Sequence, residues 1–441
     1  MLDELVFVVG EIGGDHRAAR RAILAVEVEH DVLLSLERRQ VHRLHVGVGK
    51  LEGRRCLSRV QHRDRFYSKS FFALQLAVRV NYASRCRSLA TYNLPVEKNL
   101  LGGLTSREFL RRHWQKRPLY VRNAAPRSTL VLDVRKLFTL ARRDDIESRV
   151  VVRKADRYLT THGPFAEVRE RKRDWTVLVS GVNLHNAKAD ALLRRFSFIP
   201  QARLDDVMVS YATPGGGVGP HVDSYDVFLL QGAGRRRWTI SNGGNRSVYT
   251  AGPGDLLYLP PGWRHDGVAL EPCFTYSIGF RAPRGAELAA AFLDWLHERG
   301  LPDARYRDPH LAPSRRGAAI PSAMIDFAAQ ALGRIRWSRS DVASFLGEYL
   351  SMPKPHVVFH AGRASRGSMV RLDPKTQLLY SGARFFMNGE AFTVPARAAR
   401  ALRMLADERA AAASALARAG LSRLISEWQR RGYLEHAVER R

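Results

Sequence analysis

The stretch DDVMVSYATPGGGVGPHVDSYDVFLLQGAGRRRW, residues 205–238, decides the fold of this chain. Two mainly apolar runs, Val207–Tyr211 and Val227–Leu230, flank a glycine-rich loop at 214–220, and Phe274–Ile278 repeats the pattern further along. Short runs of β-branched and aromatic residues, bounded by Gly and Pro, are typical of β-strands. We therefore predict an all-β sandwich or barrel between about residue 200 and residue 282.

The triplet His221-Val222-Asp223 directly follows the glycine loop. Side chains alternate along an extended backbone, so His221 and Asp223 share one face and Val222 points away. The later segment PGDLLYLPPGWRH, residues 253–265, predicts a strand and a Pro-Gly turn that deliver His265. Two histidines and one carboxylate make a facial triad, which leaves about three of six positions on Fe(II) free for a chelating co-substrate and O2. His221, Asp223 and His265 are therefore the candidate metal ligands and catalytic residues.

A run of three arginines, residues 235–237, opens the next predicted strand. Alternation groups Arg236 with the apolar Trp238 and Ile240, which directs Arg236 toward the core. A buried guanidinium needs a carboxylate partner, because an unpaired buried charge is costly. If no acidic side chain serves, the distal carboxylate of 2-oxoglutarate is a suitable guest, held by bidentate hydrogen bonds. A basic turn on the surface is the alternative interpretation of this run.

The composition of the 441-residue chain, 45% hydrophobic and 26% charged, is typical of a soluble globular protein with two or three domains. Three cysteines without a C-x-x-C pair indicate neither a disulfide framework nor a thiolate zinc site, and they fit a reducing cytosol. No apolar run approaches the roughly 20 residues that cross a bilayer, and the acidic start MLDE does not resemble a secretory signal. We expect a cytoplasmic protein with no membrane partner.

The net charge of +28 raises the hypothesis of a nucleic-acid partner, because Lys and Arg side chains neutralise phosphates. The 71 basic residues are mostly arginines, and they are scattered from end to end without one dense block. This distribution is equally typical of a genome-wide codon bias. A nucleic-acid partner is therefore compatible with the sequence but not required by it.

The first regular segment begins near residue 101. Thr105-Ser106-Arg107-Glu108 forms a capping box that predicts a helix start at Thr105, and Pro118 marks its end before a strand at 119–121. Residues 1–94 show no sustained helical or strand period, and they are interpreted as an N-terminal extension of uncertain order.

The pattern after Pro283 becomes helical, with an apolar stripe suited to packing or dimerisation. Residues 351–368 have the composition of a linker, and strands are predicted between about residue 370 and residue 386. Two helical stretches follow, the second of which repeats apolar residues at i, i+3, i+4 and i+7 and stops near Gly432. A last strand at 433–434 completes the pattern of a winged-helix module.

Five stretches of the chain resemble the JmjC-type ribosomal oxygenases of the cupin superfamily, specifically the bacterial ribosomal-protein arginine hydroxylases. They are LGGLTSREFLRRHWQKRPLYVR (101–122), THGPF (161–165), the stretch 205–238, the stretch 253–265, and YSIGFRAP (276–283). The spacing of Gly254, Pro260, Gly262 and His265 also matches the second conserved box of the cupins. The resemblance extends more weakly through residue 437 and omits the first 94 residues or so.

The resemblance implies an α+β protein with a mainly β core, namely a double-stranded β-helix (cupin/JmjC jelly roll), followed by a helical dimerisation region and a C-terminal winged helix. The expected domains are an uncertain extension at 1–94, a JmjC/cupin catalytic domain at 95–282, a helical dimerisation region at 283–350 and a winged-helix-like domain at 351–441. The dimer is expected to contain two copies of this chain.

The resemblance also implies a chemistry for the candidate residues. His221, Asp223 and His265 would bind Fe(II), and Arg236 would anchor 2-oxoglutarate. The co-substrates 2-oxoglutarate and O2 would drive hydroxylation of an unactivated C–H bond, with release of succinate and CO2. In the bacterial branch the substrate partner is a large-subunit ribosomal protein, hydroxylated on the β carbon of an arginine.

Two hypotheses compete with this Fe(II)- and 2-oxoglutarate-dependent protein hydroxylase. One is a non-catalytic basic protein that binds nucleic acid or ribosomes, motivated by the charge and the predicted winged helix. The other is a cupin that uses a different metal, such as Zn(II) or Mn(II), for hydrolysis or isomerisation. Neither of these last two chemistries needs a buried arginine for a dicarboxylate, so Arg236 favours the oxygenase.

Overall fold

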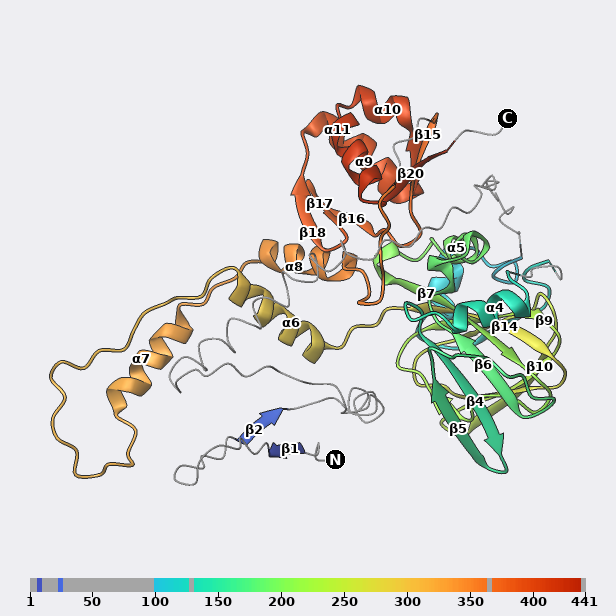
Figure 1. Ribbon diagram of the computed structural model, residues 1–441, viewed down its shortest axis with the longest axis horizontal. Helices are drawn as coiled ribbons and strands as arrows, with labels where there is room; N and C mark the ends of the chain where they lie inside the picture. The colour runs from blue at the N-terminus through green and yellow to red at the C-terminus, as the bar shows by residue number, and fades with distance from the viewer. Residues whose placement is uncertain (1–5, 10–22, 27–98, 127–130, 363–366, 438–441) are drawn as a thin grey trace. The chain divides into compact units, whose positions relative to one another are not determined.

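The computed structural model of the protein describes residues 6–9, 23–26, 99–126, 131–362 and 367–437 (Figure 1). The chain divides into two compact units, Met1–Arg87 and Ser88–Arg441. In the first unit two antiparallel strands are described, β1 (Val6–Val9) and β2 (Ile23–Val26). The rest of the predicted extension at 1–94 lies outside the described residues.

Two antiparallel sheets form the core of the second unit, and they confirm the predicted jelly roll. The larger sheet has eight strands in the order β3 (Leu119–Val121), β12 (Leu256–Leu259), β9 (Val227–Ala233), β14 (Cys273–Phe280), β7 (Leu204–Ala212), β6 (Trp175–Val179), β4 (Ser148–Lys154) and β5 (Arg157–His162). The smaller sheet has four strands in the order β11 (Asn245–Ala251), β10 (Arg236–Asn242), β13 (Arg264–Ala269) and β8 (His221–Val222).

The main hydrophobic core lies on one face of the larger sheet, where helices cover it. Val207 and Val209 of β7 point into this core together with Leu137 of α4 (Val134–Ala141) and Leu192 of α5 (Ala187–Arg194). The alternate residues of the same strand, such as Ser210, face the space between the two sheets. The larger sheet therefore has one face that packs against helices and one face that is turned toward the smaller sheet.

Helix α3 (Ser106–Arg112) begins as its sequence predicts. The Thr105 hydroxyl accepts from the Glu108 backbone N–H at 3.2 Å, and the Glu108 carboxylate accepts from the Thr105 backbone N–H at 2.9 Å. This reciprocal pair satisfies two backbone donors that a helix start leaves free. The helix then places Phe109, which is fully buried, in the main core.

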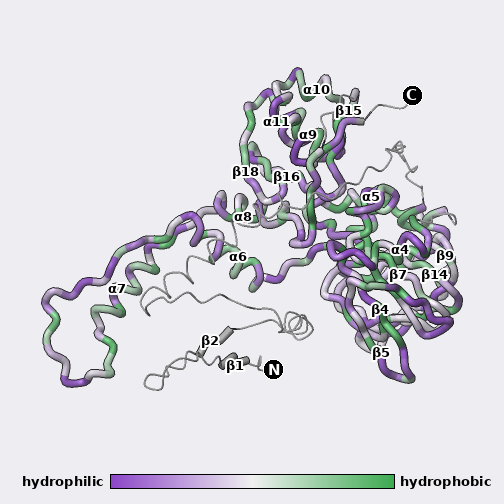
Figure 2. The backbone as a smooth tube through the Cα atoms, viewed as in Figure 1, coloured by the Kyte–Doolittle hydropathy of each residue, from purple (hydrophilic) through white to green (hydrophobic). Residues whose placement is uncertain are grey.

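Three helices follow the jelly roll: α6 (Gly285–Glu298), α7 (Ser322–Gly333) and α8 (Arg339–Ser351). Trp295 of α6 packs on Phe345 of α8, and its indole N–H donates to Glu348 at 2.9 Å. Helix α7 is different, because none of its residues is buried although hydrophobic residues run along it (Figure 2). Helix α7 lies within the stretch after Pro283 for which the sequence predicts helical structure.

The C-terminal module contains two small sheets and three helices. The sheets have the strand orders β19 (Ala410–Ala412), β15 (Met369–Leu372), β20 (Leu434–Ala437) and β16 (Leu378–Ser381), β17 (Arg384–Met387), β18 (Glu390–Thr393). The helices are α9 (Ala396–Glu408), α10 (Ala413–Arg418) and α11 (Ser422–Arg430). The expectation of two helical stretches was wrong, because the short α10 precedes the amphipathic helix. Gly432 ends that helix with φ 75°, as predicted.

Candidate metal centre

The smaller sheet brings the three candidate ligands together. Strand β8 holds only His221 and Val222, and it pairs with β13 so that His221 lies directly opposite His265. Val222 is 54% exposed and points away from the ligands, as alternation predicted. Asp223 follows β8 immediately, and its carbonyl accepts from the Gly262 N–H at 3.0 Å. The Pro-Gly turn that precedes β13 is thereby fastened to the end of β8.

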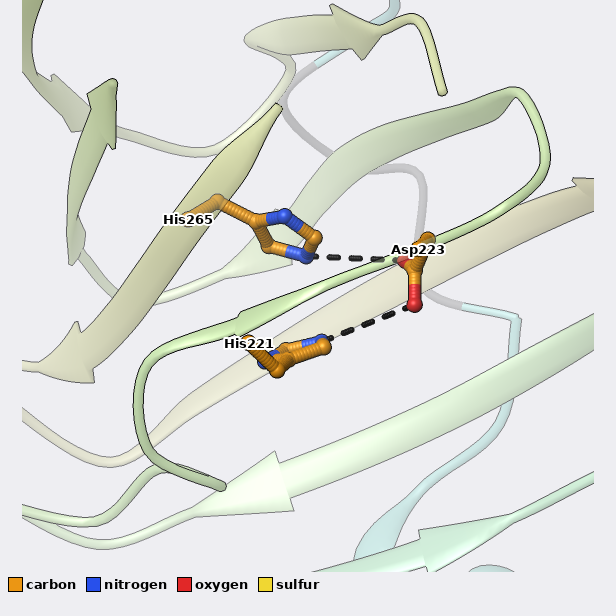
Figure 3. Close-up of side chains that lie close together, drawn as sticks. All are labelled: His221, Asp223 and His265. Atoms are coloured by element: carbon orange, nitrogen blue, oxygen red, sulfur yellow. Dashed lines mark ion pairs between the residues drawn. The ribbon is translucent and has the colours of Figure 1, made fainter. Parts of the chain in front are cut away.

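The three side chains converge on one point (Figure 3). The Nε2 atom of His221 lies 3.9 Å from Oδ1 of Asp223, and the Nε2 atom of His265 lies 3.6 Å from Oδ2 of the same carboxylate. Two atoms that each lie about 2.1 Å from one ion are at most about 4.2 Å apart. Both distances therefore suit a shared ion, and among the described residues these three form the cluster able to hold a metal.

The backbone orients both imidazole rings. The Nδ1 atom of His221 contacts the Gly219 carbonyl oxygen at 2.9 Å, and that of His265 contacts the Trp263 carbonyl oxygen at 3.0 Å. A carbonyl accepts only from a protonated nitrogen, so each ring carries its proton on Nδ1 and leaves the Nε2 lone pair free. Burial also lowers the pKa of His265, which favours the neutral form that binds metals.

A hairpin from the larger sheet supports the glycine loop. Gly219 has φ +86°, and a Cβ atom there would come within 2.9 Å of the Tyr158 ring, which belongs to β5. Only glycine fits this position, because of both the positive φ and the close ring. The contact holds the carbonyl that orients His221.

A buried carboxylate holds the turn after Asp223. Asp226 is fully buried, and it accepts hydrogen bonds from the Tyr258 hydroxyl at 2.6 Å and from the Gln115 side-chain amide at 3.0 Å. Arg203 lies 3.6 Å from the same group. These partners come from distant parts of the chain, so the turn is fixed from several directions. Sequence reasoning missed Asp226, whose only local signal is a second acid close after Asp223.

Tyr225, next to Asp226, is another residue that the sequence interpretation did not single out. Its side chain is 40% exposed, and burial followed by the charge of Asp223 raises its pKa to about 12. The hydroxyl therefore stays protonated at neutral pH and can act as a hydrogen-bond donor beside the metal ligands.

Arg236 points inward as predicted. It is 4% exposed, and the burial of Arg236, Trp238 and Ile240 alternates with the more exposed residues between them. The Nη2 atom lies 3.7 Å from Sγ of Cys273, and the guanidinium lies 5.6 Å from the centre of the Trp238 ring. Its Nε–H has no hydrogen-bond partner, and no ion pair to Arg236 occurs within the described residues.

The chemistry of the residues around Arg236 and the ligand cluster fits a dicarboxylate co-substrate beside a metal. An unpaired guanidinium in a buried site is costly, so Arg236 calls for an anion that the described protein residues do not supply. The wall next to it is polar: the Thr275 hydroxyl donates to Gln231 at 3.0 Å, and the Ser210 hydroxyl approaches the Thr275 carbonyl at 3.4 Å. The nitrogen and carboxylate ligand set is the one that non-haem Fe(II) oxygenases use.

Comparisons with known proteins agree with this geometry. Residues 191–251 and 248–288 match the family model of the JmjC domain, and residues 334–435 match that of the ROXA-like winged helix. The chain is 34% identical over 266 residues to the ribosomal protein uL16 3-hydroxylase of Escherichia coli, a match that covers 56% of this chain and 71% of the relative. In the described part of the chain, no helix is both long and apolar enough to span a membrane.

Solved structures of one relative match this chain over almost the whole length of that relative. The structure of YcfD, a ribosomal oxygenase from Escherichia coli, has a TM-score of 0.66 at 30% sequence identity and covers 75% of this chain and 98% of that one. A second structure of YcfD, in complex with cobalt and 2-oxoglutarate, matches with a TM-score of 0.65, 30% identity and the same coverage. The jelly roll, the winged helix and the extent of these matches show that the chain belongs to the JmjC-type ribosomal oxygenases, a family of Fe(II)- and 2-oxoglutarate-dependent dioxygenases.

Proposed function

We propose that this protein hydroxylates an arginine side chain of a large-subunit ribosomal protein, with His221, Asp223 and His265 as the iron ligands and Arg236 as the anchor of 2-oxoglutarate. The observation that supports the proposal best is the buried guanidinium of Arg236, which has an unpartnered Nε–H inside the same jelly roll as the ligand cluster. Neither hydrolysis nor isomerisation requires a buried anchor for a dicarboxylate, so this group favours the oxygenase.

Bound iron and 2-oxoglutarate supply the oxidative decarboxylation and the oxidation of the substrate C–H bond. The chain's own residues would hold the metal and orient the co-substrate. His221 and His265 each present an Nε2 lone pair because their Nδ1 protons are bound by backbone carbonyls. Asp223 contributes the negative charge, and Arg236 fixes one end of the co-substrate through charge-assisted hydrogen bonds. The Tyr225 hydroxyl, protonated at neutral pH, is a donor available to a substrate carbonyl.

The substrate assignment rests on the relatives. The Escherichia coli relative is named a hydroxylase of ribosomal protein uL16, and a Haemophilus influenzae relative, 36% identical over 208 residues, is named a probable ribosomal oxygenase. We carry uL16 over as the substrate of this chain, with arginine as the modified residue. A cytoplasmic location follows from that substrate, since ribosomes assemble there.

Intact-mass analysis of ribosomal proteins tests this function. In a strain that lacks the gene, one large-subunit protein should lose the mass of a single oxygen atom, and fragmentation should place that oxygen on an arginine. Complementation with the wild-type gene should restore it, whereas complementation with Asp223→Ala should not. An oxygen restored on histidine would contradict the arginine assignment, and an unchanged set of masses would remove the ribosomal substrate.

Metal analysis separates the oxygenase from a cupin with another metal. Protein purified without air should retain iron, and added 2-oxoglutarate should yield succinate only when Fe(II) is present. If the protein retains Zn(II) or Mn(II) instead of iron, and Fe(II) does not support succinate formation, this chain is not an Fe(II) oxygenase.

We also propose that the protein is a homodimer formed through its helical region. Ile325 and Leu332 of α7 are 56% and 67% exposed, and Leu293 of α6 is 59% exposed. Exposed apolar residues that recur along two helices are typical of an interface. Light scattering should give twice the chain mass, and the double variant Ile325→Asp/Leu332→Asp should give the monomer mass. A monomer in the wild-type protein would contradict the proposal.

A further inference from the structure

The outer face of the smaller sheet is positively charged. Residues of β10 alternate between the inner face, which holds Arg236, and the outer face, which holds Arg237, Thr239 and Ser241. Pairing places Arg246 of β11 and Arg264 of β13 directly opposite Ser241, on its two sides. Arg237 is thus next in sequence to the inward Arg236, and Arg264 is next to the inward His265.

These three arginines are free to bind an external anion. Arg237, Arg246 and Arg264 are exposed, and none of them forms an ion pair within the described residues. The neighbouring Arg235 behaves differently, because Glu271 pairs with it at 3.2 Å. Among the nine outward positions on β10, β11 and β13, one is acidic, Asp266, which leaves a net charge of +2 from three arginines and one carboxylate.

The spacing of the arginines indicates an extended anion. Arg246 and Arg264 lie two strand spacings apart, or roughly 10 Å, and Arg237 lies about 13 Å further along the strand direction. One phosphate or carboxylate group cannot bridge such distances, whereas a nucleic-acid strand presents a phosphate every few ångströms. The Ser241 hydroxyl lies between Arg246 and Arg264, the Thr250 hydroxyl lies beside Arg237, and both can add phosphate contacts.

We propose that this outer face, defined by Arg237, Arg246 and Arg264, binds the phosphate backbone of RNA. The choice of RNA over an acidic protein rests on the proposed function, since a ribosomal protein is itself basic and its natural partner is RNA. The tyrosine and tryptophan of these strands, Tyr249 and Trp238, alternate toward the inner side, so β10, β11 and β13 place no aromatic side chain on the outer face. Binding should therefore show little sequence preference.

Fluorescence anisotropy with a labelled oligouridine tests the proposal on the full-length, iron-loaded protein. The triple variant Arg237→Ser/Arg246→Ser/Arg264→Ser should bind more weakly, and its plot of log affinity against log salt should lose a slope of about 2, because each lost phosphate contact removes roughly 0.7. A matched control replaces three exposed arginines of the winged helix, Arg400→Ser/Arg418→Ser/Arg423→Ser, and should keep the wild-type slope.

A second variant avoids the position next to His265. Arg237→Ser/Arg246→Ser should lose about two thirds of the slope that the triple variant loses, with an unchanged thermal unfolding midpoint. Equal RNA binding by the triple variant and the wild type would overturn the proposal, as would an equal loss in the winged-helix control. Competition by oligoglutamate as effective as that by oligouridine would assign the face to acidic proteins instead. Succinate formation without RNA reports separately on the oxygenase activity.

Discussion

The two faces of the larger sheet differ in what they contact. On the helical side, aromatic and branched side chains such as Phe109, Phe228 and Tyr276 are fully buried in one large cluster. On the side that faces the smaller sheet the apolar clusters are smaller, and the buried Arg236 of that smaller sheet has an Nε–H without a partner. The difference teaches that the helical face of the larger sheet supplies stability, whereas the two histidine ligands and Arg236 belong to the smaller sheet on its other side. Substitutions on the two faces should therefore fail in different ways.

The largest effect on activity is expected from Asp223→Ala. The carboxylate supplies the single negative charge among the three ligands, so 2-oxoglutarate turnover should fall by more than a hundredfold or so, to the background of the assay. The unfolding free energy measured without metal should change by less than about 1 kcal/mol, because the side chain is partly exposed. Retained iron-dependent succinate formation would argue against the ligand assignment.

Phe109→Ala, on the helical face, should mainly lower stability. Truncation of this fully buried ring should lower the unfolding free energy by about 3–5 kcal/mol, through lost transfer free energy and the cavity that remains. Urea denaturation measures the change. Met404→Ala, at a 49% exposed position of another helix, is the control and should stay within about 0.5 kcal/mol. A loss below about 1 kcal/mol at Phe109 would show that this face is not the stabilising one.

Arg236→Met tests whether this residue serves co-substrate binding or packing. The 2-oxoglutarate concentration needed for half-maximal turnover should rise roughly 10- to 100-fold, because a charge-assisted pair worth about 1.5–3 kcal/mol is lost. The unfolding free energy without co-substrate should stay equal or rise by about 1 kcal/mol, since an unpaired buried charge is replaced by a thioether. A variant that is less stable yet binds 2-oxoglutarate normally would reverse the assignment of this residue from co-substrate binding to packing.

The smallest expected effect concerns pH, at His185 on the helical side. Burial, followed by the charge of Arg143, lowers the pKa of His185 to about 4. The unfolded state therefore binds more protons between that value and about 6.5, so this contribution to stability is present above about pH 6.5 and is lost as the pH falls toward 4. After allowance for solvent screening it should amount to about 1 kcal/mol. Thermal unfolding of His185→Asn should show a weaker decline over this range, and an identical decline in both proteins would contradict the prediction.

The sequence was sufficient for features that depend on local periodicity. Alternation placed His221 and Asp223 on one face and turned Arg236 inward, and the capping box located the start of α3 at Thr105. These rules need only the neighbouring residues. The jelly roll was predicted from the strand pattern and from the resemblance, and it is confirmed. The domain boundaries at residues 94, 282 and 350 stay a prediction.

Features that depend on distant parts of the chain could not be predicted. The direct pairing of His221 with His265 follows from sheet register, and the network around Asp226 joins residues more than a hundred positions away along the chain, such as Gln115. The strands β4 and β5 were missed because charged residues interrupt their apolar pattern.

Strand β8 has only two residues and lies at the border of its sheet, with β13 as its single neighbour there. An ion held by His221, Asp223 and His265 would link β8 to β13, which the backbone joins through only two residue pairs. Loading with iron should then protect the segment around residues 214–226 from limited proteolysis, so occupancy of the centre could be followed without any turnover.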